Sequence, residues 1–80
     1  MSNLDLYKKA FLDAFSLGDT SDVEKLEYNS IMEWDSVGHM GLIAELEEAF
    51  SIQMDMNDVI DFGSFEKGKE ILLKYNIDIK

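Results

Sequence analysis

The sequence predicts a small all-α protein, an antiparallel bundle of three main helices and one short helix, with a long loop between the first two helices. Apolar residues recur at helical spacing in four segments, helix-capping residues precede most of these segments, and no segment alternates well enough for a β-sheet. The 80 residues are enough for one domain and too few for two, so we expect a single domain spanning residues 1–80.

The first helix is expected from about residue 3 to residue 16, where apolar side chains share one helical face. Ser2 or Asn3 can cap its start, and Gly18 can end it in the left-handed conformation that glycine adopts without strain. The residues at helical spacing are Leu4, Tyr7, Phe11, Ala14 and Phe15.

A long connection follows, from Leu17 to Trp34. Its polar cluster at residues 18–22 predicts a loop, and residues 23–26 can form one helical turn. A long loop in so small a domain has to be anchored, so we expect its apolar residues to pack beneath the helices. These residues are Ile31, Met32 and Trp34.

The second helix is predicted from Ser36 to Phe50, with Asp35 as its cap. The carboxylate of Asp35 can accept hydrogen bonds from the free amides of the first turn, and it complements the positive end of the helix dipole. The residues expected to face the core are Leu42, Ile43, Leu46 and Phe50.

Two more helices complete the bundle. Asp55 is expected to cap a short helix at residues 56–62, and Ser64 is expected to cap a last helix at about residues 65–75. In the last helix Gly68 would let a neighbouring backbone come close, at a cost of about 1 kcal/mol relative to Ala. Its apolar face consists of Phe65, Gly68, Ile71, Leu72 and Tyr75.

Composition excludes several classes of function. Without cysteine the chain can form no disulfide, no thiolate metal site and no thiol nucleophile. Its 17 acidic residues against 7 Lys and Arg give a net charge of −10, which repels nucleic acids and attracts partners with basic patches, or serves solubility alone. No targeting segment and no long apolar run is present, so we expect a cytoplasmic protein without membrane insertion.

The start of the second helix is the strongest candidate for chemistry. By itself Asp35-Ser36 is an ordinary helix start, since both residue types cap helices. A hydroxyl at this position is nevertheless well suited to carry a phosphate ester, because the ester would meet free amides and the positive end of the dipole.

Two other candidates are weaker. His39 lies one helical turn after Ser36, but a hydrolase would also need an orienting acid, an oxyanion hole and room to shield a substrate. We therefore expect His39 to line the space between the second helix and the short helix, and we expect no catalytic residue. The acidic stretch from Asp55 does not match a calcium loop, because Val59 and Ile60 fall where an oxygen ligand and a glycine are needed, so we expect no metal site.

The segment Asp35-Ser36-Val37, followed by the helix pattern of residues 42–50, resembles the Asp-Ser-Leu segment and second helix of acyl carrier proteins. The resemblance covers most of the chain, since the order and spacing of all four helices also agree. It implies a carrier rather than an enzyme, with 4′-phosphopantetheine from coenzyme A attached to Ser36 and Asp35 beside it. A phosphopantetheinyl transferase would attach the arm, whose thiol holds the cargo as a thioester.

The resemblance also implies partners and a cargo pocket. Expected partners are an acyl- or aminoacyl-loading ligase and downstream transferases or synthases with basic docking patches, each meeting a monomeric carrier. The contact positions, to which the exposed side of the second helix adds Met40, are Asp35, Val37, Met40, Ala44, Glu47, Glu48 and Phe62. The candidate walls of an acyl pocket are Leu42, Leu46, Met54, Val59, Phe62 and Ile71.

Gly38 and Gly41 depart from the carriers of fatty-acid synthesis, which often have acidic residues at these positions. Each glycine also lowers helix propensity by about 1 kcal/mol. The stretch from Trp34 to Met40 is closer to stand-alone carriers of specialised pathways. Three alternatives stay open: an aminoacyl or D-alanyl carrier, an unmodified acidic interaction module, and a small hydrolase that uses Ser36 and His39.

Overall fold

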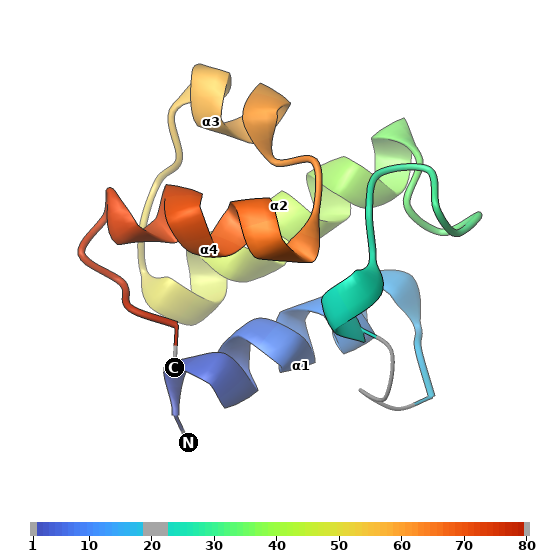
Figure 1. Ribbon diagram of the computed structural model, residues 1–80, viewed down its shortest axis with the longest axis horizontal. Coiled ribbons are helices and arrows are strands. Elements are labelled where there is room, and N and C mark those ends of the chain that lie inside the picture. The colour runs from blue at the N-terminus through green and yellow to red at the C-terminus, as the bar shows by residue number, and fades with distance from the viewer. Residues whose placement is uncertain (1, 19–22, 80) are drawn as a thin grey trace.

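The computed structural model describes residues 2–18 and 23–79, and within them it contains helices and no β-strand (Figure 1). The helices are α1 (Asn3–Phe15), α2 (Ser36–Phe50), α3 (Met56–Asp61) and α4 (Phe65–Leu73), and a 3₁₀ turn, η1, spans Val23–Lys25. Helices α1 and α2 pack together and run in opposite directions, and in Figure 1 α4 crosses in front of α2 with α3 above it. The prediction of a small all-α bundle is therefore confirmed.

The caps at the helix starts follow the sequence. Ser2 forms a capping box with Asp5, Asp35 and Ser64 accept hydrogen bonds from amides three residues on, and Asp55 accepts one from the Asn57 amide. These bonds satisfy backbone donors that helix geometry leaves without partners. Each helix therefore begins where its local sequence places a polar side chain.

The helix ends differ from the predictions. Ser16, with φ of 55°, takes the left-handed conformation after α1, and no described glycine has a positive φ, so the prediction for Gly18 is wrong. Helix α4 ends at Leu73 rather than near Tyr75, and Asn76 has the positive φ that reverses the chain after it. A short polar side chain can tolerate this conformation, so glycine is not required at either place.

The connection between α1 and α2 is anchored at two points. Residues 19–22 lie outside the described part of the chain, and the predicted turn appears as η1. The Tyr28 amide donates to the carbonyl of Gly63 at 2.9 Å, and the Phe65 amide donates to the carbonyl of Leu26 at 3.0 Å. These bonds tie the connection to the junction between α3 and α4.

Aromatic side chains dominate the core. Tyr7, Phe11 and Phe15 from α1 contact the ring of Trp34 or Phe65, or each other, and all are at most 1% exposed. Trp34 is fully buried as expected, and Ile31 is partly buried. The prediction for Met32 is wrong, because its side chain is 91% exposed.

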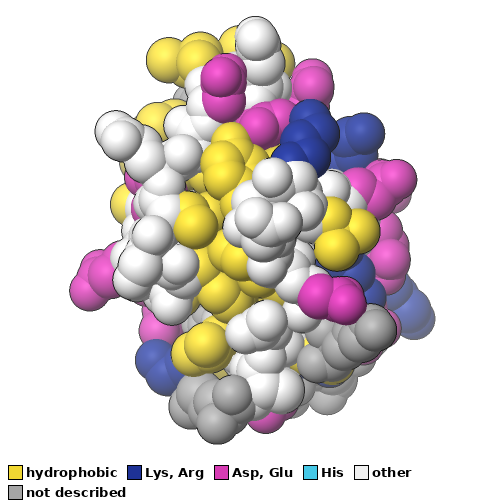
Figure 2. Space-filling view, turned by 90° about the vertical axis from the view of Figure 1, so that its left-hand side faces the viewer, with side chains coloured by type: hydrophobic (Ala, Val, Ile, Leu, Met, Phe, Trp, Pro, Cys, Tyr) yellow, Lys and Arg dark blue, Asp and Glu magenta, His cyan; other side chains and the backbone are white. Residues whose placement is uncertain are grey.

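The molecule leaves apolar surface open as well. On the side shown in Figure 2, apolar side chains lie between polar ones, and acidic side chains stand around the edge. A domain of this size cannot cover all of its apolar atoms, so such surface is normal unless a site adjoins it. Exposed apolar surface therefore indicates function here only where it adjoins a candidate site.

Candidate functional site

Ser36 is the first residue of α2, and its side chain is exposed. The Asp35 carboxylate accepts from the Gly38 amide at 2.8 Å, and the Asp35 carbonyl accepts from the His39 amide at 2.8 Å. The amides of Ser36 and Val37 precede the first turn of the helical ladder, which leaves them to solvent or to a ligand. A phosphate ester on the Ser36 hydroxyl would lie next to these two donors and the positive end of the helix dipole.

A groove opens beside Ser36, between the start of α2 and α3, with a volume of about 440 Å³. Side chains of Met40 from α2 and of Met56 and Ile60 from α3 form its open walls, and these three are 57%, 71% and 70% exposed. No described residue in the lining is an acid or a lysine. The described residues that line it are Tyr28, Ser36, His39, Met40, Met56, Val59, Ile60, Phe62 and Gly63.

The groove is not the pocket that the sequence predicts. Of the expected wall residues, only Val59 and Phe62 line it. The others are buried in the core, and a helical apolar pattern does not distinguish a sealed position from an open one. These others are Leu42, Leu46, Met54 and Ile71.

Sequence reasoning missed the walls supplied by α3. Met56 and Ile60 are four residues apart, so they lie on one side of this short helix. That spacing was visible in the sequence. Its meaning was not, because only the packing of α3 against α2 turns this exposed side into the wall of a groove.

The expected contact positions fall into two groups. Asp35, Val37, Met40, Ala44 and Glu48 are exposed, and Val37 is 79% exposed. Glu47 is partly buried, and its carboxylate accepts from the Met54 amide at 2.8 Å, which secures the turn after α2. Phe62 is fully buried at the end of α3, so the expectation that it forms a surface contact is wrong.

His39 lies between α2 and α3, as predicted. Its Nδ1 accepts from the indole Nε1 of Trp34 at 2.9 Å, and its Nε2 is 2.7 Å from the carbonyl oxygen of Val59. Both ring nitrogens are thus occupied by partners other than Ser36. A base for a serine hydrolase needs a free acceptor nitrogen aimed at the hydroxyl, so this geometry does not support that alternative.

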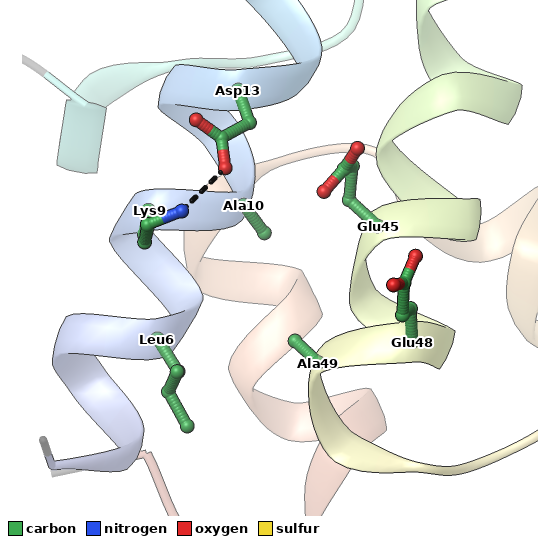
Figure 3. Close-up of a pocket in the computed structure, with 7 residues that line it drawn as sticks. All are labelled: Leu6, Lys9, Ala10, Asp13, Glu45, Glu48 and Ala49. Carbon is green, nitrogen blue, oxygen red and sulfur yellow. Dashed lines mark hydrogen bonds and ion pairs between the residues drawn. The ribbon is translucent and has the colours of Figure 1, made fainter.

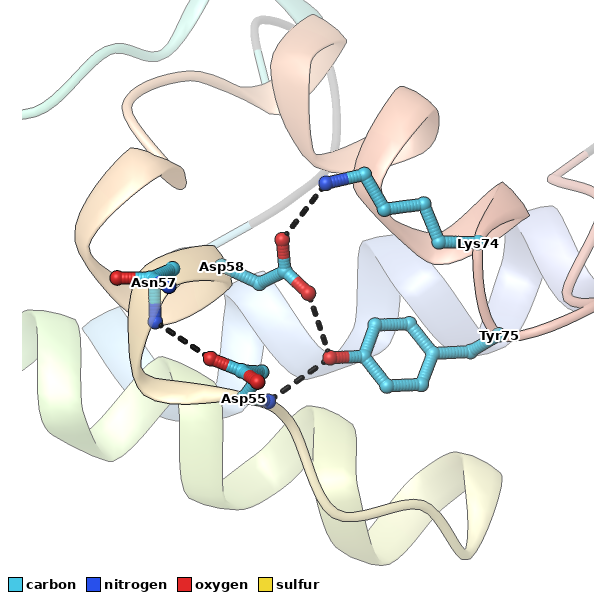
Figure 4. A network of polar contacts seen from close by, with 5 residues as sticks. All are labelled: Asp55, Asn57, Asp58, Lys74 and Tyr75. Carbon is cyan, nitrogen blue, oxygen red and sulfur yellow. Dashed lines mark hydrogen bonds and ion pairs between the residues drawn. The ribbon is translucent and has the colours of Figure 1, made fainter.

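A polar network fastens the opposite side of α3 (Figure 4). The carboxylate of Asp58 accepts from Lys74 Nζ at 2.8 Å and from the Tyr75 hydroxyl at 2.6 Å, and that hydroxyl accepts from the Asp55 amide at 2.8 Å. The hydrogen bond from Lys74, followed by that from Tyr75, lowers the pKa of Asp58. The ionised carboxylate therefore ties α3 to the end of α4.

A second hollow lies between α1 and α2, with a volume of about 270 Å³ (Figure 3). Leu6, Ala10 and Ala49 line it with apolar atoms, and Glu45 and Glu48 stand on its α2 side. Across from them, Lys9 donates to the carboxylate of Asp13 at 2.8 Å, and this bond raises the pKa of Lys9. The walls of this hollow are thus charged, unlike those of the groove beside Ser36.

Within the described residues, no group of three or more acids and histidines is placed to hold a metal ion. In the same part of the chain, no helix has the length and apolar character needed to cross a membrane. Comparisons of the chain with protein-family models, with curated proteins and with solved structures gave no match.

Proposed function

We propose that this chain is a carrier protein that holds an acyl group as a thioester on a 4′-phosphopantetheine arm attached to Ser36. The observation that supports the proposal best is the place of the Ser36 hydroxyl, exposed at the start of α2 and at the edge of an uncharged apolar groove. The helix start suits the phosphate of the arm, and the groove suits an apolar cargo.

The attachment reaction needs only one group from this chain, the hydroxyl of Ser36. A phosphopantetheinyl transferase would join Ser36 Oγ to the phosphorus of the arm and break the phosphoanhydride bond of coenzyme A. Adenosine 3′,5′-bisphosphate leaves, and the hydroxyl proton goes to the transferase or to water. The thiol comes with the arm, which allows thioester chemistry in a chain without cysteine.

The lining of the groove favours an acyl cargo over an aminoacyl or D-alanyl cargo. An aminoacyl group carries an ammonium, which is costly to place among apolar walls without a carboxylate. The lining supplies thioether, aliphatic and aromatic surface and no acid. A fatty or polyketide chain is therefore the better match.

Partner enzymes are proposed from charge and exposed apolar surface. The net charge of −10 would draw in loading ligases, transferases and synthases that have basic docking patches. Val37 and Met40 give apolar contact area next to the exposed carboxylates of Asp35 and Glu48. We place the carrier in the cytoplasm, where it would act as a monomer.

The experiment is a mass measurement. The purified chain is incubated with coenzyme A and a broad-specificity phosphopantetheinyl transferase, and its intact mass is recorded. We expect one added arm on the wild type and none on Ser36→Ala, while the matched Ser51→Ala variant is modified like the wild type. An unmodified wild-type chain, under conditions that modify a control carrier, would refute the proposal and favour an unmodified interaction module.

A further inference from the structure

His39, the chain's only histidine, accepts a hydrogen bond from Trp34, its only tryptophan. The rings of Trp34 and His39 are inclined at 15° with centroids 6.2 Å apart, a geometry compatible with the hydrogen bond between their edges. Trp34 lies in the turn before α2 and His39 in the first turns of α2, while Val59, the other partner of His39, belongs to α3. One imidazole thus joins three segments.

These partners determine the protonation state of His39. The indole nitrogen of Trp34 is a donor only, so Nδ1 of His39 has to accept and carries no hydrogen. The carbonyl of Val59 is an acceptor only, so Nε2 has to carry the hydrogen and donate it. Both bonds exist together only in the neutral ring with its proton on Nε2.

Protonation would set two donors against each other. The new hydrogen on Nδ1 would point at the indole N–H of Trp34, which is fully buried and held against the rings of Phe11 and Phe15. The indole cannot turn to water, so the imidazolium has to move away. Its Nε2 contact with Val59 depends on the same ring position and is disturbed by that movement.

We propose that His39 is a pH-sensitive clamp, which holds the two sides of the groove beside Ser36 together when its ring is neutral and lets them move apart when the ring is protonated. His39 and Val59 both line the groove, so their hydrogen bond fixes the distance between its two sides. Loosening this bond lets α3 shift with respect to α2. The same site therefore has a tight and a loose state.

Among residues 2–18 and 23–79, no carboxylate forms an ion pair with the ring. Tyr28 meets it edge-on with centroids 5.6 Å apart, and Phe62 does so at 6.2 Å. Of the described residues that line the groove with His39, Tyr28 alone has a titratable side chain. On its own helix the Asp35 carboxylate caps the Gly38 amide. On α3 the Asp58 carboxylate is engaged by Lys74 and Tyr75.

The first test uses the unmodified chain and does not depend on the proposed function. The indole N–H of Trp34 and the Cε1–H of His39 each give one NMR signal, and both signals are followed over about pH 5 to 8. We expect the two signals to change with a common midpoint. We also expect the hydrogen-exchange protection of the His39 and Val59 amides, corrected for intrinsic rates, to fall about tenfold below that midpoint.

Two variants separate a clamp from ordinary packing. His39→Gln retains an amide that can donate and accept but does not titrate in this range, so its protection should not depend on pH. Trp34→Phe removes the opposing donor and keeps the imidazole, so the protection in this variant should lose most of its pH dependence. A wild-type indole signal that stays constant while the ring signal of His39 changes would overturn the proposal, as would wild-type protection that does not change with pH.

The second test rests on the proposed function and uses the chain loaded with an octanoyl-phosphopantetheine arm. Contacts between the octanoyl chain and the methyl groups of Met40 and Met56 are measured by NMR above and below the midpoint. We expect them to weaken severalfold on protonation in the wild type and to persist in His39→Gln. Contacts that do not change with pH would refute release by the clamp, whereas failure to load the arm would count against the carrier function alone.

Discussion

At the scale of single residues, the two glycines in the first half of α2 have different surroundings. A Cβ added to Gly38 would collide with the backbone carbonyl of Glu33 and would lie 3.3 Å from the ring of Phe15. A Cβ added to Gly41 would meet no atom within 4 Å. Sequence reasoning treated both as losses of helix propensity, but the turn before α2 can approach the helix this closely only at a residue without a side chain.

This contrast gives a matched pair of variants. Gly38→Ala should lower the free energy of unfolding by about 1–3 kcal/mol or more, because backbone atoms have to move to admit the methyl group. Gly41→Ala should raise it by up to about 1 kcal/mol through helix propensity. Urea denaturation of both variants measures the difference. Equal effects of the two substitutions would show that the contact with Glu33 does not constrain the helix.

At the scale of elements, α3 depends on the contacts at its two sides. Six residues are too few for a helix that is stable by itself in water. His39 holds the helix toward α2 through the carbonyl of Val59, and Asp58 holds it toward α4 through Lys74 and Tyr75. The position of α3, and with it one wall of the groove, is therefore decided by side chains of other helices.

The Asp58 network makes stability depend on pH in a defined direction. Its hydrogen bonds from Lys74 and Tyr75 lower the pKa of Asp58, so the stabilisation is complete above the unfolded pKa of about 3.9 and is lost as the pH falls through the lower folded pKa. Asp58→Asn should be less stable than the wild type at neutral pH, and the two should converge in acid. Asp61→Asn removes an equal charge from an exposed site on α3 and serves as the control. Thermal unfolding at a series of pH values measures the difference, and a constant gap between Asp58→Asn and the wild type would contradict the assignment.

At the scale of the whole molecule, buried side chains of α4 pack against those of α1 and complete the core. The Tyr7 hydroxyl donates to the carbonyl of Phe65 at 2.6 Å, and burial, followed by the charge of Glu66, raises the pKa of Tyr7. A Cβ added to Gly68 would collide with this hydroxyl and with the ring of Phe62. The prediction that a neighbouring backbone comes close at Gly68 is wrong, because aromatic side chains make the close approach.

Gly68→Ala should therefore destabilise the fold as a whole. The buried rings have little room to move, so we expect a loss of about 1–3 kcal/mol in the free energy of unfolding. Gly63→Ala meets only one atom within 4 Å, at 3.8 Å, and should change stability by less than about 0.5 kcal/mol. Urea denaturation compares the two. A Gly68→Ala variant as stable as Gly63→Ala would show that the core is looser than the structure indicates.

The sequence by itself determined the four helices, their starting caps and the place of Ser36 at the mouth of α2, because these depend on residues within about one helical turn of one another. Tertiary structure decided which apolar side chains are sealed in the core and which line the groove. Leu42 and Met40 lie on the same helix, yet one is buried and the other forms a groove wall, since neighbouring helices cover only one of them. The bond between Trp34 and His39 and the contact at Gly38 likewise arise only when segments that no local pattern relates are folded against each other.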